Sequence, residues 1–570
     1  MATMKHPFLL SGLFCAIVLP LCAQKAGIPS EVKPGFESIQ ATSLKQDLTL
    51  LSSDSFEGRM SLTASDQKTI DWIAQQFATA GLKPAATDGK PGYLQHFRLA
   101  EYRPDRAAFS LTLTIAGTPH VFHAPEAFGV YKTAVDLSAP VFFAGFGITA
   151  PELGYDDYAN LDARGKIVLV FDHEPQEDNP KSIFNGNGLT RYATSRVKLL
   201  NAQAHGAVAV ILVAEPNRKH LTNIERQARI GGSITRTVPL PIQTIAEDEL
   251  HIPLVTVLDA PARAILERAG STPSELQSLI DADLKPQSRA LHETTATLHL
   301  RNLSERVAET ANVVGLLEGS DPKLKAETIL ISAHHDHDGS SPCPEGQGGI
   351  DDHGQPTPAG PGCIQIWHGA DDNGSGTVGV VALARAFAAN PVRPKRSILF
   401  VVFAAEERGL LGAYWMAQHP LRSLATTRAQ INFDMIGRDE KPSLQTNGLI
   451  EIPADTTNRL NLIGALYSPQ YEKVVEEANQ PVGLDLDHRF DHDSVLNVFF
   501  RSDQFPFVLK GIPAFWWFTG FHPDYHHTSD TVEKIDFAKM TRILELAYLS
   551  GWRFASDSQT PAFVSNPAIQ

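Results

Sequence analysis

The stretch that decides the fold is Thr328-Ile329-Leu330-Ile331-Ser332-Ala333-His334-His335-Asp336-His337-Asp338-Gly339, in which an apolar run leads directly into a polar cluster. Continuous apolar runs of this kind suit strands of a sheet that is covered on both faces. Runs 312–317 and 397–403 have the same character, and helices are expected at 377–389 and 409–418. This alternation predicts an α/β fold, a mixed, largely parallel sheet flanked by helices, with ligands at the carboxyl ends of the strands.

Polar clusters follow or connect the predicted strands. They are 333–339, 368–376, Glu406-Glu407, Asp434 after the apolar run 429–433, and 524–530. Carboxylates at the end of an apolar strand are costly to bury unless a divalent cation offsets their charge. Imidazole and carboxylate together are ligands for zinc, or less selectively for manganese or cobalt. Because several such clusters occur in one chain, the sequence predicts a metal-dependent site.

The length and charge of the chain limit its possible domain organisation and partners. A chain of 570 residues is too long for one ordinary core, so two or three compact units are expected. Its hydrophobic content of 43% and charged content of 20% are typical of a soluble globular protein. The net charge of −15 argues against a nucleic-acid partner, which would normally require a basic face.

The amino end indicates export. Lys5 and His6 precede an apolar run, 7–21, and the small residue Ala23 follows, which is typical of a signal peptide spanning residues 1–23. The run is short for a membrane span, and no later stretch approaches that length, so no stable membrane span is expected. We therefore expect a periplasmic or secreted protein. Lipoprotein anchoring is less favoured, because Leu21 is bulky where that processing requires a small residue.

Cysteine usage agrees with export. After removal of the signal peptide only Cys343 and Cys363 are left, and they bracket one Gly/Pro-rich loop. An isolated pair in an exported chain most often forms a disulfide. The loop that they close, 339–367, connects two of the polar clusters, so we expect it to line the substrate cleft. The alternative is a surface loop that the disulfide merely stabilises.

The polar clusters resemble those of the M28 zinc peptidases, a family of co-catalytic di-zinc aminopeptidases and their relatives. The resemblance covers segments 43–115 and 300–550. Its motifs, in the family's order, are His334-x-Asp336, Asp371-Asp372-Asn373-Gly374-Ser375-Gly376, Glu406-Glu407, Asp434 and His526.

The resemblance implies a role for each of these residues. The ligands of two Zn²⁺ ions would be His334, Asp372, Glu407, Asp434 and His526. Asp372 would bridge both ions, and which of the other ligands share an ion stays open. Glu406 would be the general base, and Asp336 would orient His334.

Some alternatives compete with this assignment. Asp371 could bridge in place of Asp372, although the spacing to the following glycines favours Asp372 in the family pattern. His527 could replace His526, but the family places its ligand four residues before Asp530. His335 and His337 are expected to be loop neighbours, and the turn 488–492, with its two histidines and an aspartate, is expected to be solvated.

The middle of the chain resembles a protease-associated (PA) domain, carried by Tyr155-Asp156-Asp157-Tyr158-Ala159-Asn160-Leu161 before Gly165-Lys166-Ile167-Val168. This unit has short apolar strands and helices, and the sequence indicates no acid, base or metal cluster of its own. The expected organisation is a first peptidase segment at 24–125, which includes a strand at 109–115, an inserted PA domain at 126–290, and a second peptidase segment at 291–570.

Together these features predict an exported zinc aminopeptidase that acts on peptides or proteins with free amino termini. A hydroxide bridging the metals would be the nucleophile, with Glu406 as the base. The preference for free amino ends is implied by the resemblance alone. The alternatives are an M28-like carboxypeptidase or dipeptidase, a glutaminyl cyclase-like enzyme, and a receptor-like homologue without activity.

Overall fold

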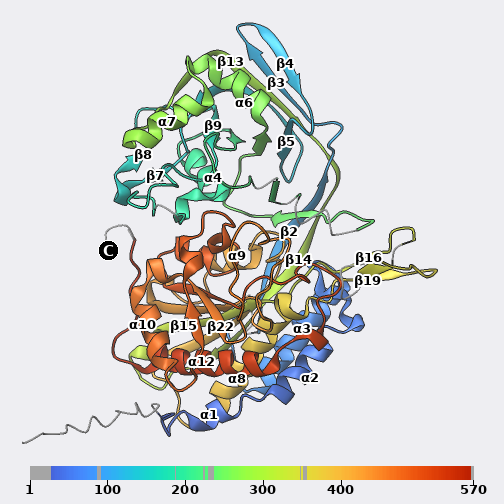
Figure 1. The fold of residues 1–570 in the computed structure, drawn as a ribbon, viewed down its shortest axis with the longest axis vertical. Helices are drawn as coiled ribbons and strands as arrows, with labels where there is room; N and C mark the ends of the chain where they lie inside the picture. Colours follow the sequence, from blue (N-terminus) through green and yellow to red (C-terminus); the bar gives the residue numbers. More distant parts are fainter. Residues whose placement is uncertain are drawn as a thin grey trace, which may run out of the picture.

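The computed structural model describes residues 27–86, 92–185, 188–222, 225, 226, 228, 236–346, 348–350 and 356–565. The expected signal peptide lies outside these residues and stays a prediction. Among the described residues, no helix is both long and apolar enough to cross a bilayer. They form two units, each built on its own sheet, which lie one above the other in Figure 1.

The lower unit contains a ten-stranded mixed sheet. Its strands are β1 (Lys83–Pro84), β2 (Leu94–Pro104), β11 (Ile242–Ile245), β14 (Asn302–Leu317), β15 (Thr328–His334), β20 (Ser397–Phe403), β21 (Thr427–Phe433), β22 (Arg459–Ile463), β23 (Asp485–Asp487) and β24 (Ala514–Phe518). Their order is β11-β2-β14-β20-β15-β21-β24-β22-β23, with β1 paired to β14. Strands β20, β15, β21 and β24 are parallel, whereas β11, β2 and β14 pair antiparallel at one edge. The predicted α/β class is confirmed.

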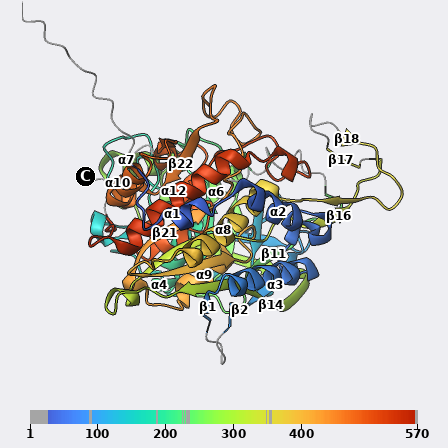
Figure 2. The same ribbon diagram turned by 90° about the horizontal axis from the view of Figure 1, so that it is seen from below.

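Helices cover both faces of this sheet, as Figure 2 shows for the face seen from below. One core contains α1 (Lys33–Glu37), α2 (Ala41–Leu51), α3 (Ala64–Thr79), α8 (Gly376–Ala389), α10 (Pro469–Ala478) and α12 (Phe537–Ser556). The opposite core contains α9 (Leu411–Gln418) and α11 (Phe505–Leu509). Along β15, Ile329 and Ile331 pack into the first core and Leu330 into the second. Because both faces are buried, the strand is apolar throughout.

The upper unit contains an eight-stranded sheet in the order β4-β3-β13-β6-β9-β10-β12-β5. Its strands are β3 (Ser110–Ile115), β4 (Thr118–Phe122), β5 (Ala127–Val130), β6 (Val135–Phe143), β9 (Ile167–Phe171), β10 (Ala209–Val213), β12 (Leu254–Val257) and β13 (Arg289–Leu300). Its helices include α4 (Ser195–Ala204), α6 (Asp259–Leu266) and α7 (Pro273–Asp283), and a short hairpin pairs β7 (Thr149–Ala150) with β8 (Tyr155–Asp156).

Several strands lie in a different unit from the one expected, because β3, β4 and most of β13 come from the expected peptidase segments but lie in the upper sheet. The strand predicted at 109–115, in the first peptidase segment, is β3, and it pairs with β13 in the upper sheet. Conversely, β11 comes from the middle of the expected insert but pairs with β2 at the edge of the lower sheet. Alternating polarity fixes which face of a strand is buried but not which sheet the strand joins.

Two long strands, β2 and β14, connect the units, and they run side by side from the lower sheet toward the upper one in Figure 1. Only Arg301 separates β13 from β14. The Asp105 amide donates a hydrogen bond to the Arg301 carbonyl at 2.9 Å. This bond joins the two places where the chain passes between the units.

Arg59 ties the amino-terminal segment to the carboxyl-end loops of the lower sheet. The side chain is fully buried, and its guanidinium donates to the carbonyl oxygens of His335 (2.9 Å), His368 (2.7 Å), Gly369 (2.8 Å) and Leu51 (3.2 Å). Burial lowers the pKa of Arg59 to about 10. The guanidinium is therefore cationic at neutral pH and holds three loop carbonyls that would otherwise be buried without a donor.

We expect Arg59→Met to lower the free energy of unfolding by about 3 kcal/mol or more, because it leaves buried carbonyls without donors. Denaturant unfolding followed by circular dichroism measures this. Arg98→Met is the matched control: Arg98 lies on β2 and forms an exposed ion pair with Glu247, so its loss should cost no more than about 1 kcal/mol. Equal effects of the two substitutions would contradict the role given to Arg59.

Candidate metal centre

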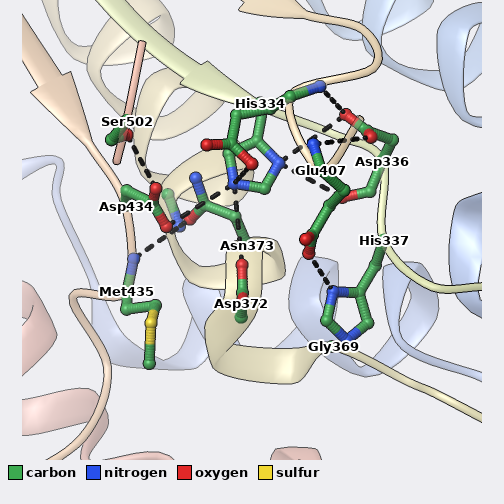
Figure 3. A network of polar contacts seen from close by, with 12 residues as sticks. His334, Asp336, His337, Gly369, Asp372, Asn373, Glu407, Asp434, Met435 and Ser502 are labelled. Atoms are coloured by element: carbon green, nitrogen blue, oxygen red, sulfur yellow. Dashed lines mark hydrogen bonds and ion pairs between the residues drawn. The ribbon is translucent and has the colours of Figure 1, made fainter. Parts of the chain in front are cut away.

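Most of the predicted site residues follow one of four parallel strands, and Figure 3 shows His334, Asp336, Asp372, Glu407 and Asp434 close together. His334 is the last residue of β15, Glu406 and Glu407 follow β20, Asp434 follows β21, and His526 lies in the loop after β24. Because these strands are adjacent and parallel, their carboxyl ends meet at one edge of the sheet. The fold thus brings together side chains that are far apart in the sequence.

Asp372 lies between the two histidines. It comes from the turn Ala370–Ser375 before α8, and its Oδ1 is 3.6 Å from His334 Nε2 while its Oδ2 is 3.1 Å from His526 Nε2. Asp434 Oδ1 lies 3.5 Å from His334 Nε2, and Glu407 Oε2 lies 3.3 Å from His526 Nε2. The geometry therefore groups His334 with Asp434 and His526 with Glu407, a pairing that the sequence left open.

Asp371 is directed away from this centre. Its Oδ1 accepts a hydrogen bond from the Gly437 amide at 2.7 Å, and its Oδ2 lies 3.3 Å from His522 Nε2. The amides of Asp371 and Asp372 both donate to Asp530, at 3.0 and 3.1 Å, which fixes the turn. Of the two adjacent aspartates, only Asp372 has its carboxylate between His334 and His526.

Asp336 holds two loops of the centre together. Its backbone oxygen is 3.2 Å from His334 Nδ1, while its carboxylate Oδ1 is 3.7 Å from the same nitrogen. The carboxylate accepts the backbone N–H groups of Glu406 (2.9 Å) and Glu407 (3.3 Å). Asp336 thus contacts His334, as the sequence suggested, and also positions the glutamate pair, which the sequence did not suggest.

Glu406 lies close enough to exchange a proton with a molecule bound at the centre. Its Oε2 is 3.6 Å from His334 Nε2, and the residue is 8% exposed. Burial raises the pKa of the Glu406 carboxyl well above its usual range. A carboxyl with a raised pKa is suited to accept a proton and then pass it on near neutral pH.

His337 and Asp338 also reach the centre, although His337 was expected to be only a loop neighbour. His337 Nδ1 is 2.6 Å from Glu407 Oε1, and donor atoms of His337, Asp372 and Glu407 lie close enough together to hold one ion. Asp338 Oδ2 is 3.4 Å from His526 Nδ1. Both residues belong to the polar run 333–339, which also contains His334. The sequence therefore indicated them as members of that cluster.

Ser502 and Asp503 were not found from the sequence. Ser502 Oγ donates to Asp434 Oδ2 at 2.7 Å. Asp503 is fully buried, and among the described residues neither of its carboxylate oxygens has a hydrogen-bond partner. The pair follows no apolar strand, so nothing in the local pattern marked it.

The remaining candidates from the sequence, His335 and the turn 488–492, have neighbours outside the centre. His335 is buried 3.6 Å from Asp66, and burial lowers the pKa of His335 to about 4. His488 Nε2 lies 3.0 Å from Glu472, in a different part of the lower unit. Asp491 accepts the amides of Gly464 and Ala465 at 2.7 and 3.1 Å, so this turn is buried at Asp491 rather than fully solvated.

The donor set fits divalent cations. His334 Nε2 and His337 Nε2 are buried and have no hydrogen-bond partner within the part of the chain that the structure describes. His334 Nε2 faces the buried carboxylates of Asp372 and Asp434, and His337 Nδ1 faces Glu407, which concentrates lone pairs and negative charge in a small volume. Cations offset that charge, and histidine with carboxylate is a zinc ligand set.

The predicted disulfide between Cys343 and Cys363 is present. Strands β16 (Ser340–Pro342) and β19 (Ile364–Ile366) form a hairpin, which continues to β17 (Gly349–Ile350) and β18 (Pro356–Thr357) and extends away from the body of the molecule in Figure 1. Its base adjoins the centre, where Trp367 Nε1 donates to the His526 carbonyl at 3.2 Å. Of the loop's described residues, those at this base are therefore the ones to which the expectation of a cleft-lining loop applies.

Comparison with known families agrees with the arrangement of strands and polar residues. Residues 312–550 match the model of peptidase family M28, and residues 137–258 match the PA domain. The match to peptidase family M28 covers the segment that holds the centre. The expected PA domain is confirmed in the upper unit, before that segment.

The chain is similar to two curated relatives. One is aminopeptidase YwaD of Bacillus subtilis (strain 168), 24% identical over 388 residues, covering 68% of this chain and 60% of that protein. The other is a probable leucine aminopeptidase 2 of Aspergillus oryzae, 30% identical over 215 residues, covering 37% of this chain and 34% of that protein. A solved aminopeptidase from Aneurinibacillus sp. strain AM-1 aligns with 94% of this chain and 97% of its own, at 18% identity and a TM-score of 0.48.

The two adjacent aspartates should respond differently to substitution. We expect Asp372→Asn to lower the Zn²⁺ content of the purified protein after dialysis against buffered Zn²⁺, because an amide is a weaker ligand than a carboxylate. Asp371→Asn should keep the Zn²⁺ content of the wild type, because its side chain faces Gly437 and His522. Elemental analysis measures both, and loss of zinc in the Asp371 variant alone would contradict this geometry.

Proposed function

We propose that this protein is an exported di-zinc metallopeptidase that hydrolyses peptide bonds at free amino termini. The observation that supports this most directly is the Asp372 carboxylate, which has one oxygen toward His334 and the other toward His526. Each histidine has a second carboxylate beside it. The match to family M28 and the aminopeptidase names of the relatives agree with the proposal.

In this proposal the chain provides five ligands. His334 and Asp434 would hold one Zn²⁺ ion, His526 and Glu407 the other, and Asp372 would bridge both. When bound, the two ions polarise the scissile carbonyl and lower the pKa of water. A receptor-like homologue without activity would be expected to have lost ligands, and all five are present.

The other residues position these ligands and move the proton. Glu406 takes the proton of the attacking water and delivers it to the leaving amine. Asp336 keeps Glu406 and Glu407 in place through their amides, and Ser502 fixes one oxygen of Asp434. His337 holds the Glu407 oxygen that does not face His526.

A preference for amino termini is supported by the aminopeptidase names of the relatives. One observation favours a carboxypeptidase instead: Arg501 donates to Tyr525 Oη at 3.2 Å, and the Tyr525 ring packs 4.1 Å from His526. A guanidinium beside the site is a potential partner for a carboxyl terminus.

Export is supported by the disulfide between Cys343 and Cys363, because disulfides persist in oxidising compartments. The signal peptide at 1–23 stays a prediction. A periplasmic or secreted location would expose the site to peptides and proteins outside the cytoplasm.

The general-base role gives a sharp prediction. We expect Glu406→Gln to lower kcat on an aminoacyl-anilide by at least ~10²-fold, because glutamine cannot accept the proton. Its Zn²⁺ content should stay that of the wild type, since Glu406 is not a ligand in the proposal. Glu472→Gln, which changes a glutamate paired with His488 elsewhere in the lower unit, is the control and should keep full activity. Full turnover by Glu406→Gln would exclude the assignment.

Terminal specificity can be tested with one peptide in three forms: unmodified, N-acetylated and C-amidated. We expect N-acetylation to lower kcat/KM by at least ~10²-fold, because a site built around a charged group rejects an analogue that lacks it. C-amidation should change kcat/KM little. The opposite pattern would support the carboxypeptidase reading through Arg501.

A further inference from the structure

The upper unit holds a second convergence of histidine and carboxylate side chains. The sequence-based expectation that this unit has no acid, base or metal cluster was wrong. His173 and Glu177 follow β9, and Glu215 and His220 follow β10. Strands β9 and β10 are parallel neighbours, so the residues beyond their carboxyl ends meet. This is the same arrangement that assembles the centre of the lower unit.

The two imidazole rings face one another inside this cluster. His173 Nδ1 lies 2.9 Å from His220 Nε2. His173 Nδ1 is also 3.1 Å from Glu177 Oε1 and 3.1 Å from Glu215 Oε1. His220 Nε2 is 2.9 Å from Glu177 Oε2 and 2.7 Å from Glu215 Oε1. All four side chains are largely buried, with exposed fractions from 2% for Glu215 to 13% for Glu177.

Hydrogen bonds alone do not satisfy this arrangement. If both rings are neutral, the two carboxylates have no cationic partner within the cluster, and if only one ring is protonated, one of the two negative charges is still unbalanced there. If both rings are protonated, the N–H groups of His173 and His220 point at each other across 2.9 Å. Glu177 Oε1 and Glu215 Oε1 are buried and, among the described residues, accept no hydrogen bond of acceptable geometry. The lone pairs instead converge on the space between the four side chains.

Each ring has a partner for its other nitrogen. His220 Nδ1 lies 3.0 Å from the carbonyl oxygen of Leu221, so this nitrogen carries a proton, and in the neutral ring Nε2 has its lone pair toward the cluster. His173 Nε2 is 2.9 Å from the side-chain amide of Asn497. A metal-binding histidine usually has such a partner on its second nitrogen, which fixes the tautomer and the ring orientation.

We propose that His173, Glu177, Glu215 and His220 bind a Zn²⁺ ion, in addition to the metals of the proposed peptidase centre. Ligand atoms around tetrahedral zinc, with bonds of about 2.0–2.1 Å, stand about 3.3 Å apart, close to the separations found here. Two neutral imidazoles and two carboxylates neutralise a divalent cation. With four protein ligands the coordination is closed, which is typical of a structural zinc rather than a catalytic one.

The ion would stabilise the contact between the two units. Asn497 belongs to the lower unit, and Arg226, from the insert, donates to the Val495 carbonyl of the same segment at 3.0 Å. His173, Asn497 and Arg501 line a cavity of about 300 Å³ between the units. With Nδ1 bound to zinc, His173 Nε2 would carry the proton and Asn497 would present Oδ1, an oxygen that has no other hydrogen-bond partner among the described residues. The zinc would thereby fix the orientation of the Asn497 side chain.

The zinc content of the full chain tests this proposal. The wild type and His220→Gln are stripped with a chelator, dialysed against buffered Zn²⁺ and analysed for zinc per chain. We expect His220→Gln to bind one equivalent fewer than the wild type. His251→Gln, at an exposed histidine of the same unit, is the matched control and should bind as many as the wild type. Equal zinc content in the wild type and His220→Gln would overturn the proposal.

If His220→Gln does not fold, a second measurement on the wild type still tests the proposal. Crystals of the wild type grown with Zn²⁺ should give an anomalous difference peak at the zinc edge between His173 Nδ1 and His220 Nε2, and the lack of a peak there would overturn the proposal. Both results are independent of the proposed peptidase activity. The one-equivalent difference at His220 concerns the upper unit only, whereas failure of the peptidase proposal would be seen in Asp372→Asn and Glu406→Gln.

Discussion

The carboxylate of Asp336, which accepts the amides of Glu406 and Glu407, is the interaction on which the lower centre depends. It joins the loop after β15 to the loop after β20, so His334 and the glutamate pair cannot move independently. Without it, two amides at the buried end of a strand would lack acceptors. Arg59 performs the complementary task, since it donates to carbonyls of the same loops. An anion that binds N–H groups and a cation that binds C=O groups thus shape the backbone that holds the ligands.

Much of the lower unit could be predicted because its signals are local. Apolar runs buried on both faces mark strands, and a polar residue directly after such a run marks the edge where parallel strands end. This marked the clusters that contain His334, Glu407 and Asp434, and the family resemblance selected the individual residues. It could not identify Ser502 and Asp503, which arrive from a segment without a strand, and it could not assign β3 to its sheet, because strand pairing depends on distant residues.

The cluster of the upper unit follows from the same local signal as the lower centre. His173 and Glu177 follow one apolar strand, and Glu215 and His220 follow the next, which is the pattern that revealed the lower centre. The family resemblance drew attention to the lower motifs, and nothing comparable marked the upper ones. Conversely, the pairing of ligands around Asp372 needs distances between side chains from five loops, which no one-dimensional pattern contains.

The ladder between β2 and β14 also constrains how the chain folds. Leu94 pairs with Val313, and Pro104 with Asn302, so the whole upper unit lies between partners in one antiparallel ladder. Closing so long an unstructured loop carries a large entropic cost and slows folding. Once the upper unit has folded, however, the Asp105 and Arg301 backbones are hydrogen-bonded and the two strands leave it already side by side. The folded upper unit therefore delivers two strands of its host's sheet already paired at one end, and a lesion that unfolds it would also remove the constraint that aligns β2 with β14.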